Sequence, residues 1–206
     1  MKRVFIFSAL GLGLILILKK IKKMSKFRSN VIDLAINEWK SWNVPTKVKE
    51  GNARTIQKLR DYYKKGVGVN DSDRYYITTA WSAAFISYIM KLAGAGKNFK
   101  YSQRHSTYIT NSIKNRKENK GAFKGYKPNE VNIELGDLVC YARQDGINYN
   151  TVGDYASHCD IVTKINNNKV EAIGGNISNS VSKSTYNLND GKIIDKEIFV
   201  VIKTNL

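Results

Sequence analysis

The sequence has few of the residues from which metal sites and disulfide frameworks are built. Its 206 residues include two cysteines, two histidines and two prolines, and neither a His-Glu-x-x-His motif nor a phosphate-binding glycine loop occurs. Cys140 and Cys159 are too few for a disulfide-rich scaffold and lack the spacing of a zinc site. We therefore expect no metal and no other cofactor, and the two cysteines form either one disulfide or two small buried thiols.

Acidic residues are also scarce, because 17 Asp and Glu stand against 34 Lys and Arg, which gives a formal charge of +17. Basic residues gather in positions 2–28, where no acid occurs, and again in positions 114–127, where Glu118 is the only acid. Such an excess suits an anionic partner: a cell-wall polymer, a membrane surface or a nucleic acid. Since no nucleic-acid-binding motif is present, nucleic acid is the least favoured of the three. The alternative for the second cluster is a solvated lysine-rich face.

The longest uncharged apolar run is short. Residues 4–18 (VFIFSALGLGLILIL) lie between Lys2-Arg3 and the stretch KKIKK at 19–23, and no small-residue cleavage site follows. A helix of this length spans about 22 Å, less than the roughly 30 Å of a bilayer core, although flanking lysines can extend its reach. We expect residues 1–24 to be a membrane-anchor or signal-like segment. The protein would then be membrane-anchored through residues 4–18 with its domain facing the cell envelope, and positive charge on both flanks leaves the orientation open.

The remainder of the chain has the composition of one globular domain, residues 25–206, with 42% hydrophobic and 11% aromatic residues overall. Apolar residues at three- and four-residue spacing predict helices over residues 28–42, 53–65, 78–94 and 102–115. The third is apolar on nearly every side, which is typical of a buried central helix.

From residue 131 onward the periodicity changes to that of short strands. Strands are expected at residues 137–142, 159–165, 169–173 and 197–203, with Asn166-Asn167-Asn168 as a hairpin turn between the second and third. Helices followed by strands predict an α+β domain, with N-terminal helices packed on a small antiparallel sheet.

Two positions carry the chemistry that the sequence offers. Ser82 lies within the first turn of the predicted central helix, where free amides stabilise an anionic nucleophile or an oxyanion. His158 begins a predicted strand, and Asn176 follows the next strand, where it can hold the imidazole in one tautomer. Nucleophile, base and orienter together form the generalised catalytic triad. A lone serine at a helix start is more often a cap.

Five motifs in order carry a family resemblance over residues 75–185. They read AWSAAFISYIMKLAG (80–94), YSQRHSTYI (101–109), GDLVCYAR (136–143), HCDIVTKI (158–165) and AIGGNISNSVS (172–182). This pattern resembles a family of uncharacterised bacterial and phage domains related to the CHAP amidases and NlpC-type peptidases of the papain-like fold.

The resemblance implies a papain-like hydrolase that cleaves an amide of peptidoglycan through a covalent intermediate, with peptidoglycan or another anionic cell-wall polymer as partner. Ser82 stands where the wider superfamily has cysteine, so the alternative is a catalytically inactive wall- or peptide-binding module. The catalytic residues would be Ser82, His158 and Asn176. Substrate contacts would come from Trp81, His105 and Asp160, although Trp81 also fits a core position and His105 an internal hydrogen bond. Asp160 could orient His158 only if the strand bent, and Cys159 points away from His158 as a rival nucleophile.

Overall fold

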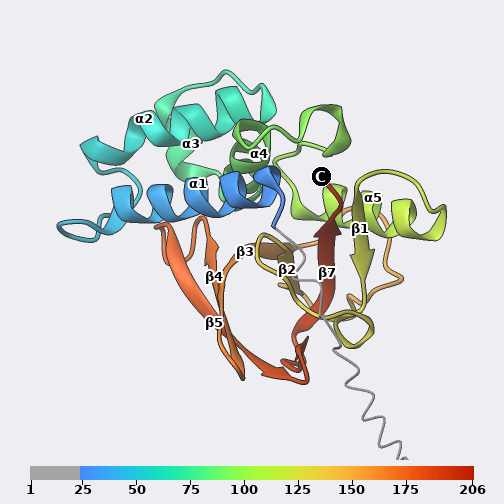
Figure 1. Ribbon diagram of the computed structural model, residues 1–206. Helices are drawn as coiled ribbons and strands as arrows, with labels where there is room; N and C mark the ends of the chain where they lie inside the picture. The colour runs from blue at the N-terminus through green and yellow to red at the C-terminus, as the bar shows by residue number, and fades with distance from the viewer. Residues whose placement is uncertain (1–23) are drawn as a thin grey trace, which may run out of the picture.

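A computed structural model of the protein describes residues 24–206 as an α+β domain, with the helices on one side of a curled antiparallel sheet (Figure 1). The helical elements are α1 (Lys26–Asn43), α2 (Ala53–Asp61), the π-helix η1 (Tyr62–Val67), α3 (Asp73–Thr78), α4 (Ser82–Leu92), η2 (Gly96–Asn98), α5 (His105–Lys117) and η3 (Pro128–Glu130). The predicted α+β class is confirmed.

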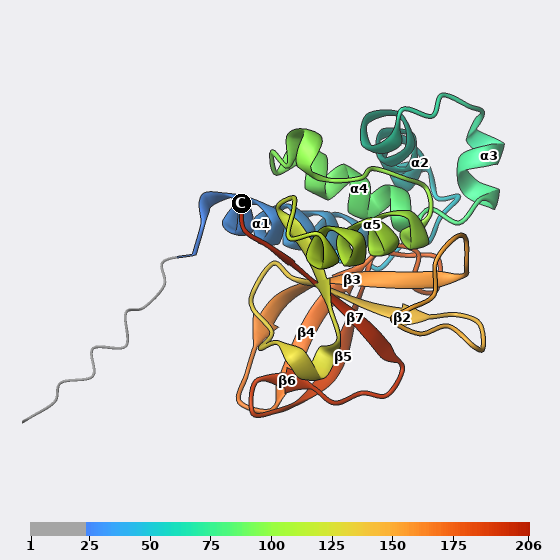
Figure 2. The same cartoon turned by 90° about the vertical axis from the view of Figure 1, so that its right-hand side faces the viewer.

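The seven strands are joined in the order β1-β7-β2-β3-β4-β5-β6. Their bounds are β1 (Phe123–Tyr126), β2 (Leu138–Ala142), β3 (Ser157–Ile165), β4 (Lys169–Gly174), β5 (Ser182–Asn189), β6 (Lys192–Ile193) and β7 (Ile198–Thr204). Every pairing is antiparallel, and β3 and β4 form the predicted hairpin around the asparagine triplet. Figure 2 shows α5 and α4 lying over β2 and β3, and this contact builds the site described below.

The central helix is confirmed but begins later than predicted. Thr78 ends α3, and Thr79 is extended, so neither threonine caps α4. The helix starts at Ser82 with Trp81 as its N-cap residue, and eight of its eleven residues are buried. The late start matters because it places Ser82 at the first helical position.

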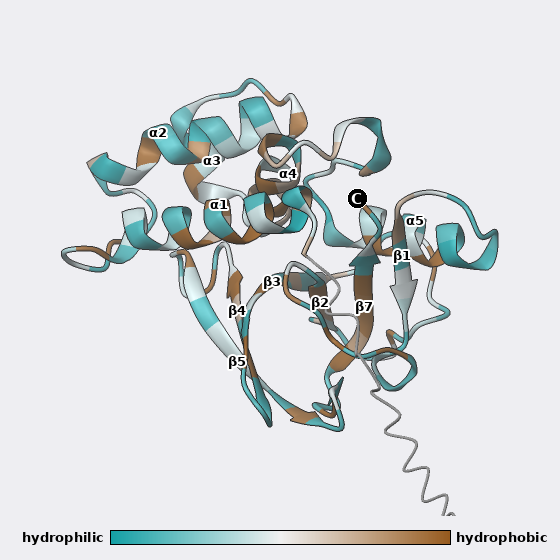
Figure 3. Ribbon diagram, viewed as in Figure 1, coloured by the Kyte–Doolittle hydropathy of each residue, from teal (hydrophilic) through white to brown (hydrophobic). Residues whose placement is uncertain are grey.

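Two apolar clusters lie on the two faces of the sheet. The larger packs α1, α4 and α5 against β2, β3 and β7 and includes Trp42, Trp81 and Phe85. The smaller fills the inside of the curl with residues such as Val162, Ala172 and Val201 from successive strands. Apolar stretches along β2, β4 and β7 are visible in Figure 3. A sheet covered on both faces has little freedom to shift the residues it presents.

A disulfide joins the two central strands. Cys140 on β2 and Cys159 on β3 are direct register partners with Cα atoms 4.1 Å apart, and both are fully buried. Of the two alternatives left open by the sequence, the disulfide is the one observed. The two cysteines therefore have a structural role, and Cys159 is not available as a nucleophile.

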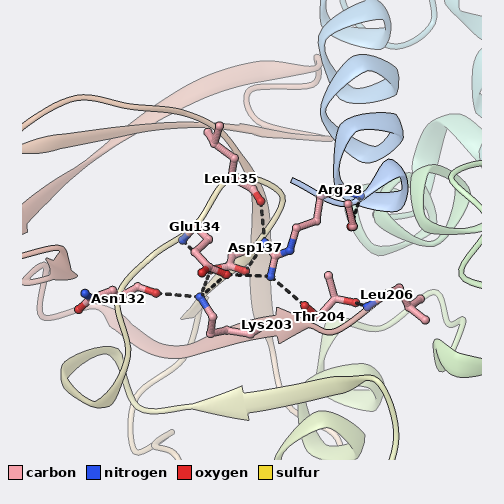
Figure 4. Close-up of polar contacts among 9 residues, drawn as sticks. Arg28, Asn132, Glu134, Leu135, Asp137, Lys203, Thr204 and Leu206 are labelled. Atoms are coloured by element: carbon pink, nitrogen blue, oxygen red, sulfur yellow. Dashed lines mark hydrogen bonds and ion pairs between the residues drawn. The ribbon is translucent and has the colours of Figure 1, made fainter. Parts of the chain in front are cut away.

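A buried ion network fastens α1 to the end of β7 and to the segment before β2 (Figure 4). The Arg28 guanidinium donates to Leu135 O at 2.6 Å, to Asp137 Oδ1 at 2.8 Å and to Thr204 O at 2.9 Å. Lys203 Nζ donates to the second Asp137 oxygen at 2.9 Å. Burial raises the pKa of Asp137, while the charges of Lys203 and Arg28 act in the opposite direction. The network links the first helix with strands that are more than 100 residues away in sequence.

The membrane anchoring that the sequence predicted is not supported by the structure. Among residues 24–206, no helix has both the length and the apolar character required to cross a bilayer. The run 4–18, from which membrane anchoring and the envelope-facing location were predicted, lies outside the described residues. Neither prediction has structural support.

Candidate functional site

Ser82 lies at the N-terminus of α4, where the backbone amides have no hydrogen-bond acceptor within the helix. The first intrahelical hydrogen bond runs from Phe85 N to Trp81 O at 2.9 Å, so the amides of Ser82, Ala83 and Ala84 have no acceptor within the helix. The helix is apolar and its body is locked in the core, which fixes the direction of this end. Such a terminus stabilises negative charge close to it.

The partner of Ser82 is His105. Ser82 Oγ and His105 Nε2 share a hydrogen bond of 2.7 Å, and each residue is 5% exposed. His105 is the first residue of α5, so two helix N-termini bring the pair together. The sequence predicted His158 as the hydrogen-bonded partner, and the structure gives that contact to His105.

The other nitrogen of His105, Nδ1, is hydrogen-bonded to the Tyr108 hydroxyl one turn along α5. Burial lowers the pKa of His105 well below 6.5, and the neighbouring His158 and Arg143 lower it further. Burial also raises the pKa of Tyr108 well above 10, as does the nearby Asp160 carboxylate. At neutral pH the pair is therefore an uncharged imidazole and an uncharged phenol.

His158 is held by a second polar chain. Its Nε2 lies 2.9 Å from Asp160 Oδ1, and Asp160 Oδ2 accepts a hydrogen bond of 2.7 Å from the Tyr186 hydroxyl on β5. His158 and Asp160 are both fully buried. Burial by itself raises the pKa of Asp160, but the hydrogen bonds from His158 and Tyr186 outweigh it and the pKa lies below the ordinary value of 3.8. Because an ionised carboxylate only accepts, Nε2 of His158 carries the hydrogen of this bond.

Gly174 on β4 makes room for this pair. A Cβ atom built there would lie 1.9 Å from Asp160 Oδ1 and 2.9 Å from His158 Nε2. No side chain other than hydrogen fits without moving the carboxylate. The requirement for glycine was not visible in the sequence, where Gly174 marked only the end of a strand.

The two histidines face each other across the site. Their ring centroids are 5.0 Å apart with the planes inclined by 37°, and the ring centroids of Tyr141 and His158 are 5.1 Å apart. Nδ1 of His158 is buried and has no hydrogen-bond partner in the described part of the chain. Leaving a buried ring nitrogen without a partner costs free energy, so this atom is an unusual feature of the cluster.

A pocket of about 430 Å³ opens beside this cluster. Its walls come from the turn before α4, the start of α5 and the β2–β3 connection: Ala80, Ser82, Gln103, Arg104, His105, Arg143, Gln144, Asp154, Tyr155, Ala156 and Ser157. The volume suits a small ligand or a short peptide segment. Ser82 and His105 thus both line one pocket.

The remaining predicted site residues have other places. Trp81 is fully buried, stacks on Trp42 with ring centroids 5.0 Å apart and donates to Glu50, so it is a core residue and not a substrate contact. Asp160 is buried behind His158 and does not line the pocket. Asn176 has a left-handed backbone with φ of 58° and makes no hydrogen bond to His158 within residues 24–206. Asp160 takes the orienting position that we predicted for Asn176.

The geometry of β3 explains why Asp160, and not Asn176, contacts His158. Residues two apart on a strand face the same side, so His158 and Asp160 are neighbours without any bend in the chain. The sequence argument required a bend and was wrong on that point. No group of three or more His, Cys, Asp and Glu side chains within the described residues could hold a metal ion.

A family profile described as "Uncharacterized protein conserved in bacteria (DUF2272)" matches residues 51–203, which is most of the chain. The chain belongs to this family. The DUF2272 match includes Ser82, His105, His158 and Asp160, whereas α1 lies outside it. No curated protein and no solved structure has significant similarity to the chain. The comparisons therefore link this DUF2272 member with no protein of known activity, and they lend no support to a relationship with CHAP or NlpC-type enzymes.

Proposed function

We propose that the protein is a serine-dependent acyl hydrolase that cleaves an amide bond, with Ser82 as nucleophile and a two-histidine site for proton transfer. The observation that carries the proposal is the 2.7 Å hydrogen bond from Ser82 Oγ to His105 Nε2, at the wall of a pocket and beside a carboxylate-held His158. A serine, an imidazole within hydrogen-bond reach and a group that orients an imidazole are the elements of nucleophilic acyl transfer.

The chemistry follows from the positions of these groups. With Nδ1–H of His105 donated to Tyr108, Nε2 is free to take the Ser82 proton while Oγ bonds to the substrate carbonyl carbon. Negative charge on the carbonyl oxygen would develop next to the amides of α4. The proton then passes from His105 to the leaving amine as the C–N bond breaks. Water, deprotonated by the same nitrogen, hydrolyses the acyl-Ser82 ester and restores the hydroxyl.

The carboxylate that holds the second histidine contributes charge. An imidazolium at His105 would stand next to the His158 ring, which is hydrogen-bonded to the ionised Asp160. The buried carboxylate offsets part of the cost of a cation there, because charges interact more strongly in the protein interior than in bulk water. His158 is thereby a positioning residue for His105.

A papain-like fold and a peptidoglycan amide as substrate are the finer parts of this proposal. Their support is the set of five ordered motifs and the basic character of the chain, since peptidoglycan and associated wall polymers carry negative charge.

The test is hydrolysis of purified peptidoglycan and of chromogenic acyl amides, followed by release of new amino groups. We expect Ser82→Ala to abolish release and His105→Asn to lower kcat by about 10²- to 10⁴-fold. Ser87→Ala is the matched control, because it removes a hydroxyl from the same helix that bonds to Ser102 O and not to a histidine. Unchanged release by Ser82→Ala would end the proposal.

Binding without catalysis is the second candidate, and the burial of His105 favours it, since a lowered pKa makes a weaker base. Ser82→Cys separates the two candidates, because a thiol is more acidic than a hydroxyl and needs less help from the base. A site built for acyl transfer should keep or gain activity with cysteine. Retained ligand binding with no turnover by either protein would identify a binding module.

A further inference from the structure

We infer that the pocket beside Ser82 contains a subsite for a substrate carboxylate, formed by the Arg143 guanidinium and the Ser157 hydroxyl. The inference deepens the proposed function, on which it rests, by naming the class of substrate: an acyl-amino acid or peptide with a free carboxylate near the cleaved amide.

The charge balance of the pocket is the first observation. Three of its lining side chains belong to charged residue types: Arg104, Arg143 and Asp154. Arg104 and Asp154 form an ion pair with each other. Arg143 forms no ion pair among residues 24–206; its guanidinium lies 5.9 Å from the Tyr141 ring centroid and is hydrogen-bonded to the Tyr141 hydroxyl. One positive charge is therefore left over in a pocket whose imidazole is neutral.

The second observation is an unsatisfied hydroxyl on another residue of the same pocket wall. Ser157 is nine-tenths buried, lines the pocket, and its Oγ has no hydrogen-bond partner in the described chain. The Arg143 amide donates to Ala156 O at 2.9 Å, so the backbone of Arg143 lies beside the residue that precedes Ser157. A buried hydroxyl is normally paired, and an arriving carboxylate oxygen would satisfy it.

A third donor completes the arrangement. Gln144 Oε1 accepts from the Ala156 amide at 2.7 Å, which fixes the carbonyl side of its amide and leaves its NH₂ group for a ligand. Guanidinium, hydroxyl and amide NH₂ are all donors. A cluster of donors with one net positive charge selects an anion over a neutral amide or ester.

The test measures binding separately from catalysis. In a Ser82→Ala background, which keeps the pocket but removes the nucleophile, N-acetyl dipeptides are titrated as free acids and as C-terminal amides by calorimetry. We expect the acids to bind at least about tenfold more tightly than the amides. Arg143→Gln should abolish the difference, Arg143→Lys should retain part of it, and Ser157→Ala should reduce it.

Lys91→Gln is the control for net charge, because Lys91 is an exposed cation at the opposite end of α4. Equal affinities of acid and amide, no binding of any acid at millimolar concentration, or an equal effect of Lys91→Gln would each overturn the subsite. If the acids bind more tightly but the wild-type protein turns over neither substrate, the subsite stands and the proposed function fails. If the wild-type protein turns over acids and amides with equal kcat/KM, the proposed function stands and the subsite fails.

Discussion

At the scale of single residues, the two histidines differ in how their rings are held. His105 has a hydroxyl on each nitrogen, whereas His158 has a carboxylate on one nitrogen and, within residues 24–206, no hydrogen-bond partner on the other. Neutral partners and burial keep His105 uncharged, while the carboxylate orients the ring of His158. In the proposed mechanism these different partners make His105 the proton carrier and His158 its support.

The lowered pKa of His105 makes stability depend on pH. Between its folded-state pKa and the ordinary value of 6.5, the unfolded chain binds a proton that the folded chain does not. The free energy of unfolding therefore falls as pH decreases below about 6.5. When the pH falls from 7 to 5, we predict that the free energy of unfolding of the wild-type protein decreases by about 2 kcal/mol more than that of His105→Gln.

Urea unfolding at both pH values gives this difference directly. Groups outside the cluster, including the buried Asp137, titrate alike in both proteins and cancel in the comparison. An identical pH dependence in variant and wild type would show that His105 is protonated in the folded state.

At the scale of elements, α4 is positioned by the π-helix η1. A Cβ atom on Gly66 would lie 2.9 Å from Ala84 O and 2.9 Å from Tyr88 N, so the two helices touch backbone to backbone at this residue. We predict that Gly66→Ala separates them, lowers the free energy of unfolding by about 2 kcal/mol and reduces activity by tilting Ser82.

Thermal unfolding together with hydrolysis rates measures both effects. Lys64→Ala, an exposed residue of the same element, should change stability by less than about 0.5 kcal/mol. A Gly66→Ala protein as stable and active as the wild type would show that η1 does not set the position of α4.

The elements that the sequence predicted are those with strong periodicity. Helices α1, α4 and α5 and strands β2, β3, β4 and β7 were expected within a few residues, because their apolar residues repeat at helical or strand spacing. Strand β5 was missed because its sequence SKSTYNLN is mostly polar and faces inward mainly through Tyr186 and Leu188. The π-helix was missed because a π-turn adds one residue to an ordinary helical pattern, which periodicity does not resolve.

The site was predicted in part for similar reasons. Ser82 and His158 were singled out from their local context, and both lie in one cluster. The position of His105 depends on where α5 meets α4, which is a tertiary contact that no local pattern encodes. His105 had been assigned to substrate binding, yet a histidine at the start of a predicted helix was a signal that could have been read as a base.

At the scale of the whole molecule, the Arg28 network joins the first helix to the last strand. Arg28 is 8% exposed and bonds to β7 and to the segment before β2, so its loss would leave Asp137 with Lys203 as its remaining cationic partner. We predict that Arg28→Met destabilises the protein by about 3 to 5 kcal/mol.

Lys26→Met on the exposed face of α1 is the control, and calorimetric unfolding is the measurement. A loss below about 1 kcal/mol for Arg28→Met would mean that α1 is held by apolar packing alone.

The central claim is that Ser82 is an activated nucleophile in a pocket open to ligand. Reaction with a fluorophosphonate, followed by intact-mass and peptide analysis, tests it most directly, because only a hydroxyl with a nearby base and oxyanion donors reacts quickly. We predict a single adduct on Ser82, absent in Ser82→Ala and formed at least about a hundredfold more slowly in His105→Asn. No adduct on Ser82, or labelling at the same rate in His105→Asn, would contradict the account.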